Sequence, residues 1–150
     1  MKLHLLLSIC AALTLCTNIH GETTIDNNLI QRMEEVGPKG TVSTLVYLVD
    51  HVDVKSLSDS ISQANMRFVD RHQLVVETLQ ATALSTQGSI LASLKSQQGV
   101  TKITPFWISN VIRVDARPDV IHQLANRSDV LHIYLNYSIE LVTPVHMGPA

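Results

Sequence analysis

The hydrophobic pattern is clearest in the last third of the chain. Apolar runs separated by turn-forming residues predict two strands, a helix and a third strand there. Ser109-Asn110 is the turn between the first two strands, Pro118-Asp119 opens the helix, and Ser128-Asp129 ends it. The predicted elements are strand 103–108, strand 111–116, helix 118–125 and strand 130–135.

The first part of the chain adds one strand and a long helical region. Residues 41–49 are almost continuously apolar, which predicts a central strand buried on both faces. Helical periodicity follows from about Ser56 to Gln98, with Ser56 or Ser58 as N-cap, an expected break between residues 84 and 88, and Gly99 as the stop. Residues 22–40 are predicted to be a leader segment with a short helix after Asp26 that carries Leu29, Ile30 and Met33, ended by Gly37-Pro38.

The order of these elements predicts an α+β fold. After the leader the order is strand, helix, strand, strand, helix, strand, which is the ferredoxin-like, or split βαβ, arrangement. We therefore expect residues 41–142 to form a four-stranded antiparallel sheet with its helices on one face. The helix at Pro118 lacks a usual N-cap residue, because Arg117 precedes it; Asp115 or a backbone contact is the expected substitute.

The N-terminal segment has the pattern of a secretory signal peptide. Lys2 precedes an apolar stretch, and Gly21 provides a small residue at the predicted cleavage point, so residues 1–21 are expected to be removed and the product secreted. A lipoprotein anchor at Cys16 is disfavoured by the bulky Leu15 before it. Both cysteines, Cys10 and Cys16, lie in this segment, so we expect no disulfide framework and no thiolate metal site.

Charge and hydropathy restrict the partner class. Without Lys2 the remaining chain carries ten basic and thirteen acidic residues, a formal charge of −3. Without a basic stripe, a nucleic-acid partner is not expected. No second hydrophobic stretch is long enough to predict membrane attachment once the signal is removed.

Several phrases of the sequence resemble the propeptide domains of subtilisin-like serine proteases, in particular those of the larger, bacillopeptidase-F-like type. The phrases are Ile25-Asp26, Val46-Tyr47-Leu48, Val52-Asp53, RHQLVVETLQATALSTQGSILASL (71–94) and FWISNVIRVDARPDVIHQLANRSDV (106–130). The sequence departs from the family pattern at Arg117 and at Ser128, where proline is frequent. The resemblance implies an inhibitor and folding chaperone whose partner is a subtilisin-like serine protease.

The catalytic motifs of such proteases, D-[ST]-G, H-G-T-H and G-T-S, do not occur in the sequence. The resemblance therefore implies a non-enzymatic role without a cofactor, and a nucleophile–base motif for another enzyme class is not evident either. Two alternatives stay open: a secreted protein-binding module unrelated to proteases, and the N-terminal part of a longer subtilase gene product.

Period-two alternation predicts a docking face on the sheet. If Phe106 and Ile108 face the helices, Trp107 lies on the opposite, open face. The same alternation places Ile112, Val114, Leu131 and Ile133 inward. The predicted docking face consists of Trp107, Val111, Arg113, His132 and Tyr134.

The segment Thr143–Ala150 has no helical or strand periodicity and contains two prolines and a glycine. In subtilase propeptides the corresponding segment lies in the protease cleft as a substrate-like strand. The resemblance implies that Ala150, if it ends the chain, enters the first specificity pocket, with Pro149, Gly148 and Met147 in the next subsites. A linker to another domain is the alternative.

Other polar clusters have simpler interpretations. Asp50, His51 and Asp53 follow a strand, where a polar turn is expected, and no histidine stands at ligand spacing for a metal site. The run 70–72 (Asp-Arg-His) fits a solvated helix face. Two sequences, at Asn126 and at Asn136, match the N-glycosylation acceptor pattern.

Overall fold

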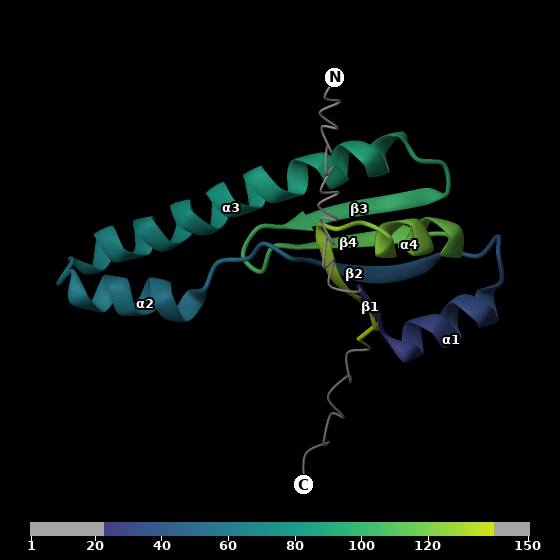
Figure 1. Cartoon of the computed structure of the whole chain (residues 1–150), viewed down its shortest axis with the longest axis horizontal. Helices are drawn as coiled ribbons and strands as arrows, with labels where there is room; N and C mark the ends of the chain where they lie inside the picture. Colours follow the sequence, from purple (N-terminus) through teal and green to yellow (C-terminus); the bar gives the residue numbers. More distant parts are fainter. Residues whose placement is uncertain (1–22, 140–150) are drawn as a thin grey trace, which may run out of the picture.

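The computed structural model describes residues 23–139, and these form an α+β fold with a five-stranded mixed sheet and four helices. The elements in chain order are β1 Thr24–Ile25, α1 Asn27–Val36, β2 Val42–Leu48, α2 Val54–Gln63, α3 Phe68–Ser96, β3 Val100–Phe106, β4 Val111–Ala116, α4 Pro118–Ala125 and β5 Val130–Leu135 (Figure 1).

The sheet has the strand order β1-β5-β2-β4-β3. The pairs β2–β4, β2–β5 and β3–β4 are antiparallel, whereas β1 pairs with β5 in parallel. The prediction of a four-stranded antiparallel sheet is therefore wrong, because the sheet has a fifth strand and that strand is parallel to its neighbour. The fifth strand comes from the segment expected to be a leader, because Thr24 and Ile25 pair with His132 and Ile133 at the edge of β5.

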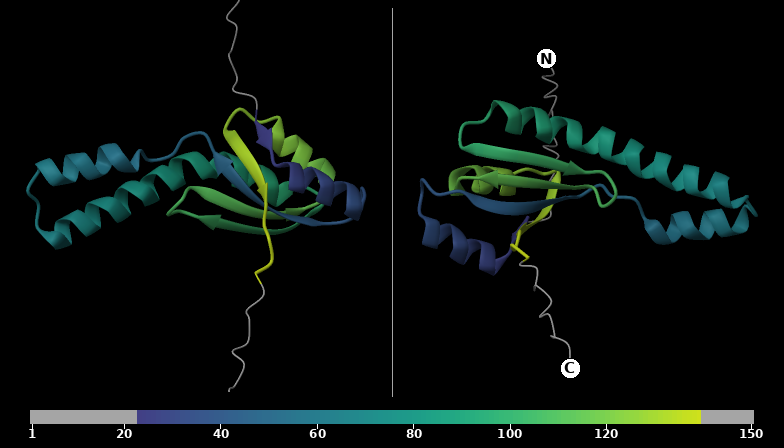
Figure 2. Two further views of the ribbon diagram at one scale, coloured as in Figure 1. Left: turned by 90° about the horizontal axis from the view of Figure 1, so that it is seen from below. Right: turned by 180° about the vertical axis from the view of Figure 1, so that it is seen from behind.

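The helices α1, α3 and α4 pack on the same face of the sheet (Figure 2). Their buried side chains join alternate residues of the strands in one core, as the period of two in a strand requires. The largest fully buried side chains of this core are Leu29, Ile90, Leu94, Ile112, Ile121 and Ile133. The predicted inward positions of Ile112, Val114 and Ile133 are confirmed.

The central strand β2 is buried on one face only. Val42, Thr44, Val46 and Leu48 are buried, while Tyr47 on the opposite face is 36% exposed. The prediction of burial on both faces is wrong, because no helix within residues 23–139 covers the second face. Thr44 is tolerated in the core because its hydroxyl donates to the Val114 carbonyl at 2.9 Å.

A bulge in β5 changes one inward residue. The β2–β5 register shifts between Tyr47 and Leu48, so that Leu48 lies opposite Val130. Val130 is therefore buried in the core, whereas Leu131 is only half-buried and lines a surface pocket beside Tyr47. The prediction of an inward Leu131 is wrong for this reason.

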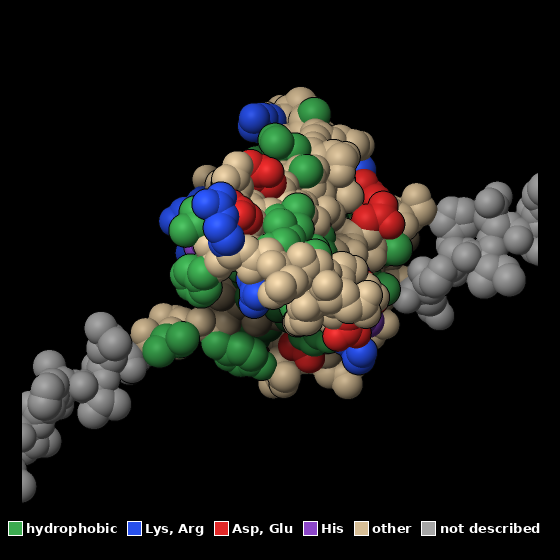
Figure 3. Space-filling model, turned by 90° about the vertical axis from the view of Figure 1, so that its left-hand side faces the viewer, with side chains coloured by type: hydrophobic (Ala, Val, Ile, Leu, Met, Phe, Trp, Pro, Cys, Tyr) green, Lys and Arg blue, Asp and Glu red, His purple; other side chains and the backbone are tan. Residues whose placement is uncertain are grey.

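The predicted long helix is divided into α2 and α3, which form a hairpin that extends away from the sheet (Figure 1). The break lies between Gln63 and Phe68, where Asn65 has a left-handed φ of 46°, and not between residues 84 and 88. Asn tolerates this conformation better than most residues because its short polar side chain bonds locally. The view onto the tip of this hairpin shows hydrophobic side chains at the surface among charged ones (Figure 3).

Helix α2 begins at Asp53 and not at either predicted serine. The Asp53 carboxylate accepts hydrogen bonds from the backbone N–H groups of Lys55 and Ser56 at 3.0 and 3.1 Å. These bonds satisfy donors that the first turn of a helix leaves free. The hydroxyl and the backbone N–H of Ser56 are the main reasons why the pKa of Asp53 lies below its usual value.

Helix α4 begins without a side-chain cap, as the sequence predicts. Arg117 is the N-cap residue, and its guanidinium forms an ion pair with Asp119 at 3.0 Å. Asp115, one of the expected substitutes, is engaged elsewhere, with Arg113 and Ser43. The start of α4 is instead tied to the turn between α3 and β3, because the Arg117 N–H donates to the carbonyl of Gly99 at 3.0 Å.

In residues 23–139, no helix has the combination of length and apolar character that crossing a membrane demands.

Candidate docking face

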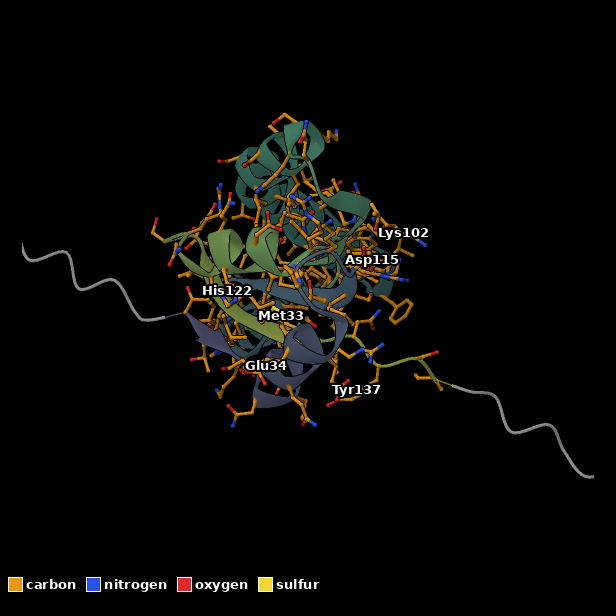
Figure 4. All side chains as sticks on the ribbon, turned by 90° about the vertical axis from the view of Figure 1, so that its right-hand side faces the viewer. Met33, Glu34, Lys102, Asp115, His122 and Tyr137 are labelled. Atoms are coloured by element: carbon orange, nitrogen blue, oxygen red, sulfur yellow. The ribbon has the colours of Figure 1, made fainter. Side chains whose placement is uncertain are left out.

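The face of the sheet opposite the helices, called here the open face, presents its side chains in three rows that cross four strands. The register that pairs β3 with β4, β4 with β2, and β2 with β5 fixes these rows. The first row is Phe106, Val111, Tyr47 and His132; the second is Thr104, Arg113, Leu45 and Tyr134; the third is Lys102, Asp115, Ser43 and Asn136. Figure 4 shows Lys102 and Asp115 on this side of the molecule and His122 on the other.

Aromatic side chains occupy one end of the open face. The rings of Tyr47 and Tyr134 meet edge to face, with centroids 5.4 Å apart and planes at 85°. The ring of His132 lies 5.8 Å from that of Tyr134. Phe106 is 42% exposed and Tyr134 43% exposed, so both expose apolar surface that a partner can cover. Aromatic residues that combine apolar area with few rotatable bonds are frequent at protein interfaces.

A charged network occupies the other end of the open face. The Arg113 guanidinium donates to both oxygens of Asp115, at 2.9 and 2.8 Å. The Ser43 hydroxyl donates to Asp115 at 2.5 Å and accepts hydrogen bonds from Arg113 at 3.1 Å and from the Asn136 side-chain amide at 2.9 Å. Side chains of β4, β2 and the residue after β5 are thereby held together, which fixes the surface they present.

The electrostatics of this network favour the charged pair. Burial alone raises the pKa of Asp115, but the hydrogen bonds from Arg113 and Ser43 and the nearby charges of Arg113 and Lys102 outweigh burial. The pKa of Asp115 is therefore lower than its usual value of 3.8, and the pKa of Arg113 is raised, chiefly by its hydrogen bond to Asp115.

Three of the five predicted docking residues, Arg113, His132 and Tyr134, lie on the open face at a position that a partner can contact. Val111 also belongs to this face by register, but it is only 3% exposed. Its neighbours across the two adjacent strands are the aromatic residues Phe106 and Tyr47. The prediction of Val111 as a contact residue is wrong, because it is buried beneath the face.

The predicted position of Trp107 on the open face is also wrong. Strand β3 ends at Phe106, and Phe106 itself lies opposite Val111 on the open face. Trp107 belongs to the turn that follows and lies beside helix α3, where it lines a pocket together with Pro105 and Ala83. Phe106 therefore occupies the open-face position that was predicted for Trp107.

The turn that carries Trp107 is fixed by Asn110. This residue is buried and has a left-handed φ of 49°. Its side-chain amide donates to the carbonyl of Asp50 at 2.6 Å and to the Thr86 hydroxyl at 2.8 Å, and its side-chain oxygen accepts from Gln87 at 2.9 Å. One side chain thus connects the β3–β4 turn, helix α3 and the segment between β2 and α2.

A surface pocket of about 370 Å³ adjoins the open face at this end of the sheet. Its walls come from the end of β2, the segment after it, helix α3 and the β3–β4 turn. The lining residues are Tyr47, Leu48, His51, Val52, Val54, Leu79, Thr82, Trp107, Ile108, Ser109, Asn110 and Leu131. The mainly apolar wall beside Tyr47 extends the aromatic end of the open face.

Sequence reasoning missed Tyr47, Phe106, Ser43 and Asp115 as open-face residues. Tyr47 was not predicted because β2 was expected to be buried on both faces. Phe106 was not predicted because it was expected to face the helices. The signal for the Ser43–Arg113–Asp115 network was the alternation of Arg113 and Asp115 with apolar residues in β4, and the pairing of β4 with β2 places Ser43 opposite Asp115.

The other polar candidates among residues 23–139 have structural roles or lie apart from one another. Within residues 23–139, no group of three His, Cys, Asp or Glu side chains is arranged to hold a metal ion. Asp53 is occupied as the cap of α2, and a ring nitrogen of His51 lies 3.0 Å from the Val49 carbonyl. The predicted signal peptide (1–21) and the predicted cleft residues Met147, Gly148, Pro149 and Ala150 lie outside the described residues.

Searches of family models, of curated proteins and of solved structures found no match to this chain.

Proposed function

We propose that the chain is a secreted, subtilase-propeptide-like inhibitor and folding chaperone of a subtilisin-like serine protease. The observation that supports this most is the open face, where an exposed aromatic end and an ordered charged end share one side of a rigid sheet. A fixed surface of this kind suits protein docking, because little conformational entropy is lost when a partner covers it.

The topology supports the proposal at the level of fold. Strands β2, β3, β4 and β5 are adjacent in the order β5-β2-β4-β3, all antiparallel, and α4 connects β4 with β5. This order is the one expected of a ferredoxin-like, split βαβ unit, and it supports the proposal that such a unit is present, with β1 and α1 added to it. The FWISN and PDVIHQLA phrases of the propeptide resemblance occupy the end of β3 with its turn, and helix α4.

In the proposed mechanism the open face binds the surface of the protease, and the segment 143–150 lies in the cleft as an added strand. Tyr47, Phe106 and Tyr134 supply apolar contact area, and Arg113 with Asp115 orients the contact. Attachment to a folded domain raises the effective concentration of the tail at the cleft. A docked sheet also stabilises the folding transition state of a large α/β protease domain, whose non-local contacts form slowly.

Deletion of residues 143–150 tests this mechanism. The full chain is expected to inhibit subtilisin competitively against a chromogenic peptide, and the truncated chain to inhibit at least about 100-fold more weakly because the cleft-binding strand is gone. Circular dichroism is expected to be the same for both chains. Equal inhibition by the two chains would contradict the tail mechanism, and absence of inhibition by either folded chain would contradict the proposed function.

A further inference from the structure

The flank of helix α3 next to the edge strand β3 carries a groove that the proposed docking face does not include. The groove has a volume of about 360 Å³ and is lined by Gln80, Ala83, Leu84, Gln87, Gly88, Leu91, Pro105 and Trp107. Helix α3 and strand β3 run beside one another here (Figure 1). The side-chain NH2 of Gln87 already donates to the Asn110 side-chain oxygen and to the Phe106 carbonyl, and Ala83, Leu84, Leu91, Pro105 and Trp107 make most of the groove lining apolar.

A protruding apolar side chain stands at the rim of the same groove. Leu84 is 80% exposed, although full burial of a leucine side chain is favourable by about 1.5–3 kcal/mol. One turn further along, Gly88 lies inside the helix, and a Cβ placed on it would meet nothing within 4 Å. A glycine in a helix interior costs about 1 kcal/mol relative to alanine, and here it leaves the backbone open to close approach.

The part of helix α3 that surrounds the groove carries no charged side chain. From Thr78 to Leu94 the sequence of α3 contains no Asp, Glu, Lys or Arg, although the exposed side of a surface helix is normally charged. In a two-fold interface each surface patch meets its own copy, so any charge at its centre faces a like charge. This flank has no charge that would face a like charge, and it places the protruding Leu84 beside a groove. It can therefore be complementary to a second copy of itself.

We propose that this flank binds a second copy of the chain through a two-fold interface. Leu84 of each copy enters the groove of the other, and the two α3 helices approach each other at Gly88. The open face lies on another side of the sheet from the groove-lining helix, so the paired molecule keeps its docking faces available. This inference does not depend on the proposed protease partner.

The single tryptophan of the chain provides a direct probe, because Trp107 lines the groove. The experiment follows tryptophan fluorescence and sedimentation equilibrium of the purified chain from Glu22 onward, without the predicted signal peptide, from about 1 µM to about 1 mM. We expect twice the monomer mass at the upper concentrations and a blue shift of the emission over the same range.

Two variants at the groove and one control complete the test. Leu84→Glu is expected to remain monomeric throughout, because it places like charges opposite each other, and Gly88→Leu is expected to weaken association at least 10-fold by closing the groove. Val69→Glu, at an apolar position nearer the start of the same helix that is 70% exposed, against 80% for Leu84, is expected to associate like the parent. Circular dichroism establishes that each variant is folded.

Three outcomes would overturn the inference: a monomer at every concentration, association of Leu84→Glu equal to that of the parent, or association without a change in Trp107 emission. Binding of an unrelated protein to this groove by a chain that stays monomeric would also overturn it.

Discussion

At the scale of single residues, Asp115 links the stability of the fold to the order of the docking face. Its carboxylate accepts from Arg113 and Ser43, and these contacts keep its pKa below the usual value. A carboxylate with a lowered pKa stabilises the folded state above the unfolded-state pKa, and the contribution disappears as the pH falls through the folded-state pKa. The network is therefore expected to be fully effective at neutral pH and weakened by acid.

The variant Asp115→Asn tests this linkage. At pH 7 its free energy of unfolding is expected to be about 1–3 kcal/mol lower than that of the parent, because Arg113 loses its charged acceptor in a partly buried site. The difference from the parent should shrink as the pH is lowered below 3.8, the usual value for an aspartate, where the parent loses the same interaction. Urea unfolding at a series of pH values measures both; a difference independent of pH would contradict the role given to the charge.

Asn110 is a second residue with more than a local role. Replacement by alanine is expected to cost about 2–4 kcal/mol, because the buried Gln87, the half-buried Thr86 and the Asp50 carbonyl lose their hydrogen bonds to Asn110, and because alanine tolerates a left-handed φ less well than asparagine. Asn65 is the matched control, since it has a similar φ of 46° but is exposed. Asn65→Ala should cost less than about 1 kcal/mol. Equal costs for the two variants in denaturant unfolding would assign the effect to backbone strain alone.

At the scale of elements, the prediction from sequence succeeded where periodicity is strong and local. Strands β2, β4 and β5 and helix α4 were found within a few residues, because alternation and turn residues define them. The break between α2 and α3 was misplaced because Gly88 is a visible helix breaker, whereas the true break contains Asn65 with a left-handed φ of 46°, a conformation that the hydrophobic pattern does not reveal. Strand β1 was not predicted because two residues are too few to show an alternating pattern. Thr24 and Ile25 form a strand only because they pair with β5.

The candidate site was predicted only as far as strand alternation reaches. Arg113, His132 and Tyr134 were placed on the correct face, because their strands are regular. Trp107 was misplaced because the end of β3 cannot be determined from an apolar run that continues into a turn. The Ser43–Arg113–Asp115 cluster joins residues about 70 positions apart, and only the pairing of β2 with β4 brings them together.

Helix α3 offers a test at the level of one element. Gly88→Ala, made in the Leu84→Glu background to exclude association, is expected to raise the free energy of unfolding by about 0.5–1 kcal/mol, because alanine favours the helix and its Cβ meets no neighbour. Urea unfolding followed by circular dichroism measures the change. Destabilisation instead would mean that the space beside Gly88 is filled in solution.

At the scale of the whole molecule, the proposed function gives the two sides of the sheet separate roles. One side carries α1, α3 and α4 and holds the core, and the other side exposes aromatic and charged rows. Substitutions on the open face should therefore affect partner binding without loss of the fold, while core substitutions should affect both.

The variant Tyr134→Ala tests the separation of roles. It removes the edge-to-face contact with Tyr47 and exposed aromatic area, and it is expected to weaken inhibition of subtilisin about 10-fold or more, as for an interface residue of high energy. His122→Ala, an exposed residue on the helix-covered side (Figure 4), is the control and should inhibit like the parent. If both variants inhibit equally well and are folded, the open face is not the docking face.

The most direct measurement for the central claim is a titration of the purified chain against active subtilisin, with hydrolysis of a chromogenic peptide as the readout. The account predicts competitive inhibition with an inhibition constant below about 1 µM, because a fixed docking face and an attached tail bind together. A chain that is folded by circular dichroism and leaves the rate of hydrolysis unchanged at concentrations well above this value would contradict the claim.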